Sequence, residues 1–176
     1  MSKTDEGEQL KVQTALDNLA EQVSSLLCDE TIAIIGIRSR GDILANRLAK
    51  LLKAKNIKIS NQGILDITLY RDDLNRMGGQ ARVRATEINF DITDCIILLV
   101  DDVLFTGRTV RAALDALMDI GRPKAIRLAV LVDRGGRELP IQADFVGLKL
   151  SSSSPAKHVQ VMLKETDGQD GIILRD

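Results

Sequence analysis

Apolar residues fall into two kinds of segment along this chain. Residues 31–37, 96–100 and 126–132 are apolar at nearly every position, which is typical of strands buried on both faces. Residues 9–27, 42–52 and 110–120 carry apolar residues every three or four positions, which predicts helices with one buried face. This alternation of strands and helices predicts an α/β fold, with a mostly parallel, twisted, Rossmann-like sheet flanked by helices.

The remaining segments have weaker patterns. Residues 63–70 alternate and are predicted to form a half-exposed strand. Residues 143–150 and 158–163 are predicted to be shorter strands of a small cap (hood), which spans about 143–165 and includes the N-terminal segment. Residues 71–87 are polar, contain Gly78-Gly79 and show neither period over most of their length. Because long irregular segments in compact domains are usually functional, we interpret 71–87 as a flexible lid loop, the alternative being a disordered hairpin tip.

Length and composition fit a single domain spanning residues 1–176, with 44% hydrophobic and 28% charged residues. The net charge of −1 argues against a protein that coats nucleic acid through bulk charge. Cys28 and Cys95 sit among apolar neighbours and fit buried free thiols in a reducing cytosol. Residues 1–8 lack the apolar stretch of a signal peptide, and no apolar run approaches the ~20 residues of a membrane helix. We therefore expect a cytoplasmic protein that does not enter a membrane.

The strongest candidate site follows the strand at 96–100. Asp101 and Asp102 come directly after it, and the loop Thr106–Thr109 then leads into a helix. In open α/β sheets, ligands bind at the carboxyl ends of strands. Gly107 lets the backbone approach an anion, the threonines and amides donate hydrogen bonds, and the helix N-terminus adds positive potential. The two carboxylates suit hydroxyl groups or hydrated Mg²⁺, so the site is predicted to bind a ribose phosphate.

A second strand, 31–37, ends in a cluster of two arginines and a glycine. Its residues are Arg38, Ser39, Arg40 and Gly41, followed by a predicted helix. Guanidinium groups at a helix N-terminus match the oxygens of a pyrophosphate, although two surface arginines at a turn are the simpler alternative. A phosphate-binding P-loop and a Gly-x-Gly-x-x-Gly motif are both absent from the sequence.

The order of an apolar strand, two acids and Thr-Gly-Arg-Thr resembles the phosphoribosyl pyrophosphate (PRPP) motif of type I phosphoribosyltransferases. Residues 65–74 and 128–140, including Tyr70-Arg71-Asp72-Asp73 and Asp133-Arg134-Gly135, extend the resemblance. Together they are similar to the bacterial bifunctional pyrimidine-operon attenuation regulators, which are also uracil phosphoribosyltransferases. The similarity runs from about residue 12 to about residue 165.

The resemblance implies a pentosyltransferase that transfers ribose-5-phosphate from PRPP to uracil, giving UMP and pyrophosphate. It implies Mg²⁺ carried by PRPP, with Asp101 and Asp102 near it, rather than a metal site built by the protein alone. It also implies a homodimer or higher homo-oligomer. The expected catalytic residues are Asp101, Asp102 and Arg84. The expected PRPP- and nucleotide-binding residues are Arg38, Ser39, Arg40, Gly41, Asp101, Asp102, Val103, Leu104, Phe105, Thr106, Gly107, Arg108 and Thr109. The expected base-binding residues are Val132, Asp133 and Arg134, and the expected lid residues are Arg71, Asp72, Arg82 and Arg84.

Two alternatives stay open at this point. The first is an RNA-binding regulator of pyrimidine-operon mRNA leaders with vestigial catalysis, for which Arg47, Lys50 and Lys53 supply a basic helix face, with Lys55 and Lys58 behind them. Against it, Asp17, Asn18 and Glu21 occupy first-helix positions where the resemblance leads us to expect basic or hydroxyl residues. A solvated helix face is the simpler interpretation of the lysines. The second alternative is a phosphoribosyltransferase for another base.

Overall fold

The computed structural model describes residues 11–72, 84–150 and 158–175. Its centre is a five-stranded parallel sheet in the order β2-β1-β3-β4-β5. The strands are β1 (Thr31–Ile37), β2 (Lys58–Leu65), β3 (Ile96–Leu104), β4 (Ala125–Asp133) and β5 (Phe145–Lys149). The chain moves outward from β1 to β2 and then returns to β3 on the other side of β1. The topological switch point therefore lies between β1 and β3.

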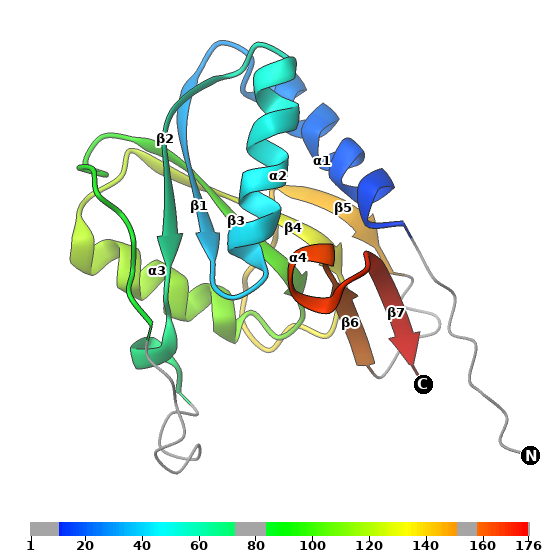
Figure 1. Ribbon diagram of the computed structural model, residues 1–176. Coiled ribbons are helices and arrows are strands. Elements are labelled where there is room, and N and C mark those ends of the chain that lie inside the picture. Colours follow the sequence, from blue (N-terminus) through cyan, green and yellow to red (C-terminus); the bar gives the residue numbers. More distant parts are fainter. Residues whose placement is uncertain (1–10, 73–83, 151–157, 176) are drawn as a thin grey trace, which may run out of the picture.

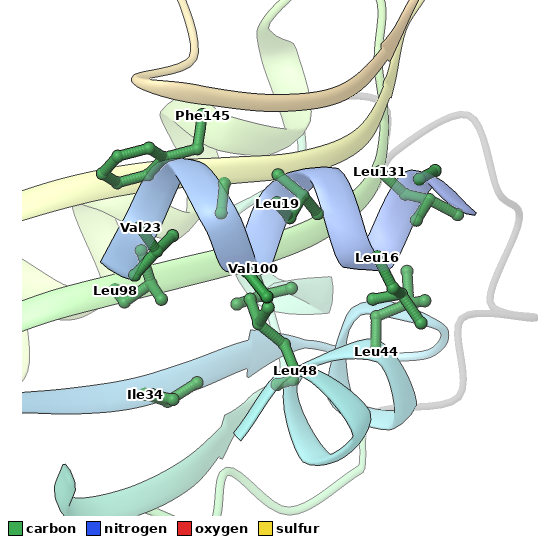
Figure 2. Close-up of a cluster of buried hydrophobic side chains, with 14 of the residues drawn as sticks. Leu16, Leu19, Val23, Ile34, Leu44, Leu48, Leu98, Val100, Leu131 and Phe145 are labelled. Atoms are coloured by element: carbon green, nitrogen blue, oxygen red, sulfur yellow. The ribbon is translucent and has the colours of Figure 1, made fainter. Parts of the chain in front are cut away.

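Helices cover both faces of this sheet (Figure 1). They are α1 (Val12–Leu26), α2 (Gly41–Ala54) and α3 (Arg108–Ile120). Side chains of α1 and α2 share one hydrophobic core with the sheet, and α3 shares a second core with the other face. Figure 2 shows the first core, where Leu16 of α1 and Leu44 of α2 lie close to each other and Val100 of β3 lies near Leu48 of α2. The predicted α/β fold with helices on both faces is confirmed.

Alternate residues of β3 belong to the two cores. Leu98 and Val100 pack with α1 and α2, whereas Ile97 and Leu99 pack with α3. This is why the segment is apolar without alternation. The strand also runs four residues beyond its predicted end at Val100, to Leu104, so that predicted end is wrong and the strand includes Asp101 and Asp102. The reason is that β4 keeps pairing with it, up to Leu104 and Asp133.

A small antiparallel sheet of β6 (His158–Met162) and β7 (Gly171–Arg175) forms a cap with the short helix α4 (Lys164–Asp167). In Figure 1 this unit lies beside the N-terminal end of α2, near Gly41. The assignment of 143–150 to the cap is wrong, because β5 pairs with β4 in the central sheet and packs against α1. Residues 151–157, also assigned to the cap, lie outside the described residues.

The predicted strand at 63–70 is also wrong in its position. β2 ends at Leu65, and Thr68–Tyr70 form the 3-10 helix η1. Asp66 accounts for the change, because its carboxylate accepts hydrogen bonds from the backbone and the hydroxyl of Thr68 and so starts a turn. Most of the predicted lid, residues 73–83 with Arg82, lies outside the described residues. At the end of α1, Leu26 is 62% exposed, so it does not belong to the predicted buried face of this helix, and the predicted burial of Cys28 is wrong because its side chain is exposed.

Candidate active site

The switch point between β1 and β3 contains a polar cavity of about 250 Å³. Arg38, Ser39 and Arg40 enter it from the loop after β1, and Asp101, Asp102 and Val103 enter it from β3. Thr109, in the first turn of α3, also lines the cavity. Asp66, Thr68 and Arg71 line it from the segment after β2. Seven of the thirteen residues predicted to bind PRPP or nucleotide therefore line one cavity. Thr106 and Arg108 line a neighbouring cavity instead, which Thr109 also lines.

Two glycines allow the loop after β1 to come this close to β3. A Cβ on Gly36 would lie 2.4 Å from the Cα of Asp42. A Cβ on Gly41 would lie 2.4 Å from the carbonyl oxygen of Val100. Because neither neighbour is a flexible side chain, only glycine fits at these positions. The first turn of α2 thus rests directly on the strand that carries the acidic pair.

The acidic pair is held by backbone hydrogen bonds. Asp101 is 5% exposed and accepts a hydrogen bond of 2.9 Å from the N–H of Asp102. Asp102 accepts one of 2.8 Å from the N–H of Val103. Burial, and secondly the charge of Asp102, raise the pKa of Asp101 well above its usual range. Burial also raises the pKa of Asp102, although the Val103 N–H and the charge of Arg40 act in the opposite direction.

The predicted phosphate loop forms the N-terminus of α3. Gly107 has φ +92°, in the left-handed region that favours glycine, and it is the N-cap residue of the helix. The Arg108 N–H donates to the hydroxyl of Thr106, at 3.3 Å. The Arg108 guanidinium binds Asp72 and Glu138, at 2.6 and 2.7 Å. Arg108 therefore joins the loop to neighbouring segments, and the groups of this loop that can bind an anion are its N–H groups and threonine hydroxyls. Leu104 is buried in the core and has no side-chain access to a ligand.

A second cavity of about 200 Å³ adjoins the first, with which it shares Arg38, Ser39, Asp66 and Thr68. Arg84 completes its lining, and the Arg84 N–H donates to Asp66. Burial alone would raise the pKa of Asp66, but the hydrogen bonds from Thr68 and Arg84 outweigh it and lower that pKa. Sequence reasoning did not identify Asp66, although an acid directly after a strand is the same signal that identified Asp101.

The arginines of the loop after β1 have unused hydrogen-bonding capacity. The Nε atoms of Arg38 and Arg40 are buried and have no hydrogen-bond partner among the described residues. Buried donors without partners are costly, and they are commonly explained by a ligand or by water. Arg38 also forms an ion pair of 2.8 Å with Glu87. The two guanidinium groups line the same cavity, where they can pair with an anionic ligand.

The predicted base segment lies next to the phosphate strand. Val132 pairs with Val103, and the Arg134 N–H donates to the carbonyl of Leu104. The Arg134 guanidinium lies over the Phe105 ring, 3.7 Å from its centroid. Asp133 does not have a free carboxylate, because it accepts hydrogen bonds from the Gly135 N–H and from the Arg137 guanidinium.

Arg137 is a further structural residue that sequence reasoning missed. Its guanidinium donates to the carbonyls of Leu104, Phe105, Gly135 and Ile141 as well as to Asp133. It thus ties the base segment to the start of the phosphate loop. A single arginine in a polar loop gives no sequence signal for such a role.

The basic helix face is less available than its sequence suggested. Arg47 binds both Glu165 and Asp170 of the cap region, and Lys55 binds Glu21 of α1. Lys50, Lys53 and Lys58 are exposed. On α1, Asn18 donates to the carbonyl of Gly147 at the edge of β5, whereas Asp17 and Glu21 are exposed.

Among residues 11–72, 84–150 and 158–175, no group of three or more histidine, cysteine or acidic side chains could hold a metal ion. Over the same ranges, no helix combines the length and the apolar character needed to span a membrane.

Comparison with known proteins agrees with this geometry. The phosphoribosyl transferase domain family matches residues 7–166. A hypoxanthine-guanine phosphoribosyltransferase structure from Bacillus anthracis superimposes with a TM-score of 0.71 at 17% identity, covering 99% of this chain and 100% of that one. The type I phosphoribosyltransferase fold is therefore confirmed, and the chain belongs to the phosphoribosyl transferase domain family.

Relatives with higher sequence identity share one name. The Deinococcus radiodurans protein named "Bifunctional protein PyrR" is 57% identical over 150 residues, which cover 84% of this chain and 80% of the relative. The protein of the same name from Elusimicrobium minutum is 49% identical over 170 residues, which cover 96% and 93%. The resemblance expected from the central motifs is confirmed over most of the chain.

Proposed function

We propose that this protein is a uracil phosphoribosyltransferase, which transfers ribose-5-phosphate from PRPP to N1 of uracil and releases UMP and pyrophosphate. The observation that carries the proposal is that Asp101, Asp102 and Thr109 line one cavity with Arg38 and Arg40. Carboxylates suit the ribose hydroxyls, while the α3 N-terminus and the arginines suit the two phosphate ends. The 57% identity to a protein named PyrR supports the same family of reactions.

Each end of PRPP has a proposed partner. Thr106, Gly107 and Thr109 bind the 5-phosphate, because their hydroxyls and N–H groups stand at a helix N-terminus. Arg38, Arg40 and Arg84 neutralise the pyrophosphate that leaves. Their side chains contribute to the two adjoining cavities.

The base binds through the strand end Val132–Arg134. Uracil presents carbonyls that alternate with N–H groups, and backbone amides and carbonyls match that pattern. The exposed Phe105 ring and the Arg134 guanidinium above it provide a flat neighbour for a base. The Asp133 carboxylate is occupied by Arg137, so its proposed contribution to base binding is through the backbone.

Mg²⁺ is proposed to arrive with PRPP. Asp101 and Asp102 offer only two carboxylates, fewer than a metal site built by the protein requires, but they fit a hydrated ion already bound to PRPP oxygens. When bound, the ion would offset the negative charge of the pyrophosphate.

In the reaction, the bond between C1 of the ribose and the pyrophosphate oxygen breaks, a bond from N1 of uracil to C1 forms, and the N1 proton leaves to solvent. Positive charge develops at C1 as the first bond breaks. Asp101 and Asp102 lie on the side of the cavity proposed for the ribose and stabilise that charge electrostatically. No described side chain is a general base by its position, so orientation of the two substrates supplies most of the catalysis.

The test is incubation with uracil, PRPP and Mg²⁺, with UMP and pyrophosphate measured separately. Equal amounts of both products are expected. Hypoxanthine, guanine and cytosine, offered as competitors at the same concentration, are expected to yield no more than traces of nucleotide. Absence of UMP between pH 6 and 9, or preference for a purine, would contradict the proposal.

A second proposed function is regulation of pyrimidine genes by binding their mRNA leaders in response to uridine nucleotides. The relatives' name, "Bifunctional protein PyrR", supports it, and Lys50, Lys53 and Lys58 leave an exposed basic surface. Asp17 and Glu21 on α1 oppose it electrostatically. Binding to a leader hairpin should tighten with UMP and weaken steeply with salt. No binding at low salt, or a flat salt response, would remove this function and leave the enzyme proposal intact.

We also propose a cytoplasmic homodimer or larger homo-oligomer. Leu69, Met118 and Ile120 support self-association, because these large apolar side chains are 64%, 57% and 44% exposed. Light scattering after gel filtration measures the mass directly, and a monomer at micromolar concentration would contradict this part of the proposal.

A further inference from the structure

An arginine of the proposed pyrophosphate loop is bound by the cap. Nη2 of Arg40 donates to both carboxylate oxygens of Asp167, at 3.2 and 3.4 Å. Arg40 directly precedes α2, whereas Asp167 is the last residue of α4, 127 positions later in the chain. In Figure 1 α4 lies beside the N-terminal end of α2, which this loop leads into. The contact therefore connects the cap to the proposed active site.

Asp167 is itself firmly held. One of its carboxylate oxygens accepts hydrogen bonds from the Leu163 N–H at 2.8 Å and from the Thr166 hydroxyl at 2.7 Å. Both donors belong to the turn that starts α4. The carboxylate is thus fixed to its own backbone before it meets Arg40, and it can act as a rigid anchor for a longer, more flexible side chain.

Arg40 has donors left for a ligand. Only its Nη2 is used by Asp167, and its buried Nε has no hydrogen-bond partner among the described residues. Arg40 also lines the cavity that contains Asp102, and its charge acts on that carboxylate. One edge of the guanidinium is therefore anchored by the cap, while the same side chain lines the cavity.

We propose that Asp167 is a positioning residue, which holds the Arg40 guanidinium in the orientation that binds the pyrophosphate group of PRPP. This inference rests on the proposed function. An unanchored arginine loses side-chain freedom when it binds a ligand, and an anchor imposes that loss before the ligand arrives, so the ligand binds more tightly.

Asp167 also has an electrostatic effect that opposes its anchoring of Arg40. A carboxylate beside the site also repels an anion, so Asp167 could instead weaken PRPP binding. The Asp167 side chain is 22% exposed, and water screens its charge at the distance of a ligand beyond Arg40. Because the repulsion is screened and the anchoring is direct, we expect the anchoring to dominate. Whether the Kd for PRPP rises or falls when Asp167 loses its charge therefore distinguishes the two effects.

The experiment is calorimetric titration of the full-length protein with PRPP and Mg²⁺, without a base. Asp167→Asn keeps the hydrogen-bonding shape but removes the charge, and should raise Kd by about three- to tenfold. Glu165→Gln is the matched control, because it removes the same charge from the same helix but contacts Arg47, which lies outside the cavity. It should leave Kd within about twofold of the wild type.

A double variant separates positioning from cap stability. If Asp167 acts through Arg40, Asp167→Asn should have no further effect on Kd in an Arg40→Gln background. If Asp167→Asn does not fold, Asp167→Glu keeps the charge, displaces the anchor by one methylene, and should still weaken PRPP binding relative to the wild type. Thermal unfolding of every variant is measured beside Kd.

Each outcome has a definite meaning. Unchanged or tighter PRPP binding in Asp167→Asn, an equal loss in Glu165→Gln, or additive losses in the double variant would each overturn the inference. If the wild type binds PRPP but forms no UMP from uracil, only the uracil assignment falls, and the positioning role is still tested by Kd. If the wild type binds no PRPP, both proposals fall.

Discussion

The N–H of Asp102 donates a 2.9 Å hydrogen bond to the carboxylate of Asp101, its neighbour in β3. Asp102 in turn accepts from the N–H of Val103. The backbone of the strand end thus helps to fix both carboxylates. This places two carboxylates of raised pKa side by side at the edge of a cavity, an arrangement that is costly for folding and useful for binding a polyol or a developing cation.

Asp101→Asn combined with Asp102→Asn should lower UMP formation by at least about 100-fold, because the double variant loses the charges proposed to stabilise the transition state. The expected loss is mainly in kcat rather than in the KM for uracil. Steady-state kinetics with each substrate varied in turn measures this. Asp115→Asn, an exposed change on α3, is the control, and activity of the double variant above a tenth of the wild type would contradict the proposed roles.

The same raised pKa predicts a gain in stability for Asp101→Asn. The pKa of Asp101 is higher in the folded protein than in the unfolded chain, where it is 3.8. Ionisation of Asp101 therefore lowers the stability of the fold as the pH rises from 3.8 to the folded-state pKa. The variant should therefore melt at least about 2 °C above the wild type at neutral pH. The difference should shrink as pH falls from the raised value towards 3.8. Melting curves from pH 8 to pH 4 test this, and a variant that is less stable at pH 8 would refute it.

Gly41→Ala should destabilise the protein by about 1–3 kcal/mol, because the new methyl group would lie 2.4 Å from the carbonyl oxygen of Val100. Separating α2 from β3 would also move Arg40 away from Asp102, so PRPP binding should weaken. Urea unfolding and PRPP titration measure the two effects. Asn46→Ala, an exposed position on the same helix, should change neither. Equal stability of Gly41→Ala and the wild type would show that the close contact is unimportant.

Arg137→Gln should cost about 2–4 kcal/mol of stability, because four backbone carbonyls and Asp133 lose a charged donor. We also expect the KM for uracil to rise more than the KM for PRPP, since the disturbed segment is Val132–Arg134. Arg127→Gln removes an exposed ion pair with Asp144 and should cost less than about 1 kcal/mol. Similar losses in the two variants would argue against a special role for Arg137.

The sequence predicted the central architecture because its strands are buried on both faces. Residues 31–37 match β1 at both ends, since a short apolar run without alternation is typical of a strand that is buried on both faces. Errors arose where pairing or a local turn outweighed the pattern. β3 extends through two acids because β4 continues to pair with it, and a strand was expected where Asp66 starts η1.

The candidate site was predictable where it follows strand ends and unpredictable where it depends on distant segments. Asp101 and Arg38 follow apolar runs, so their meeting at one edge of the sheet could be inferred. The link from Arg40 to Asp167 could not, because it joins positions 127 apart in the chain. The binding of Arg47 by Glu165 and Asp170 was likewise invisible, and the basic face was overestimated for that reason.

A crystal structure with PRPP and Mg²⁺ bound tests the central claim most directly. We predict that the 5-phosphate lies against the N–H groups and hydroxyls of Thr106–Thr109, that the ribose hydroxyls lie within hydrogen-bonding distance of Asp101 and Asp102, and that the pyrophosphate lies against Arg38 and Arg40. A PRPP molecule bound elsewhere, or one whose ribose does not reach the two carboxylates, would contradict the account.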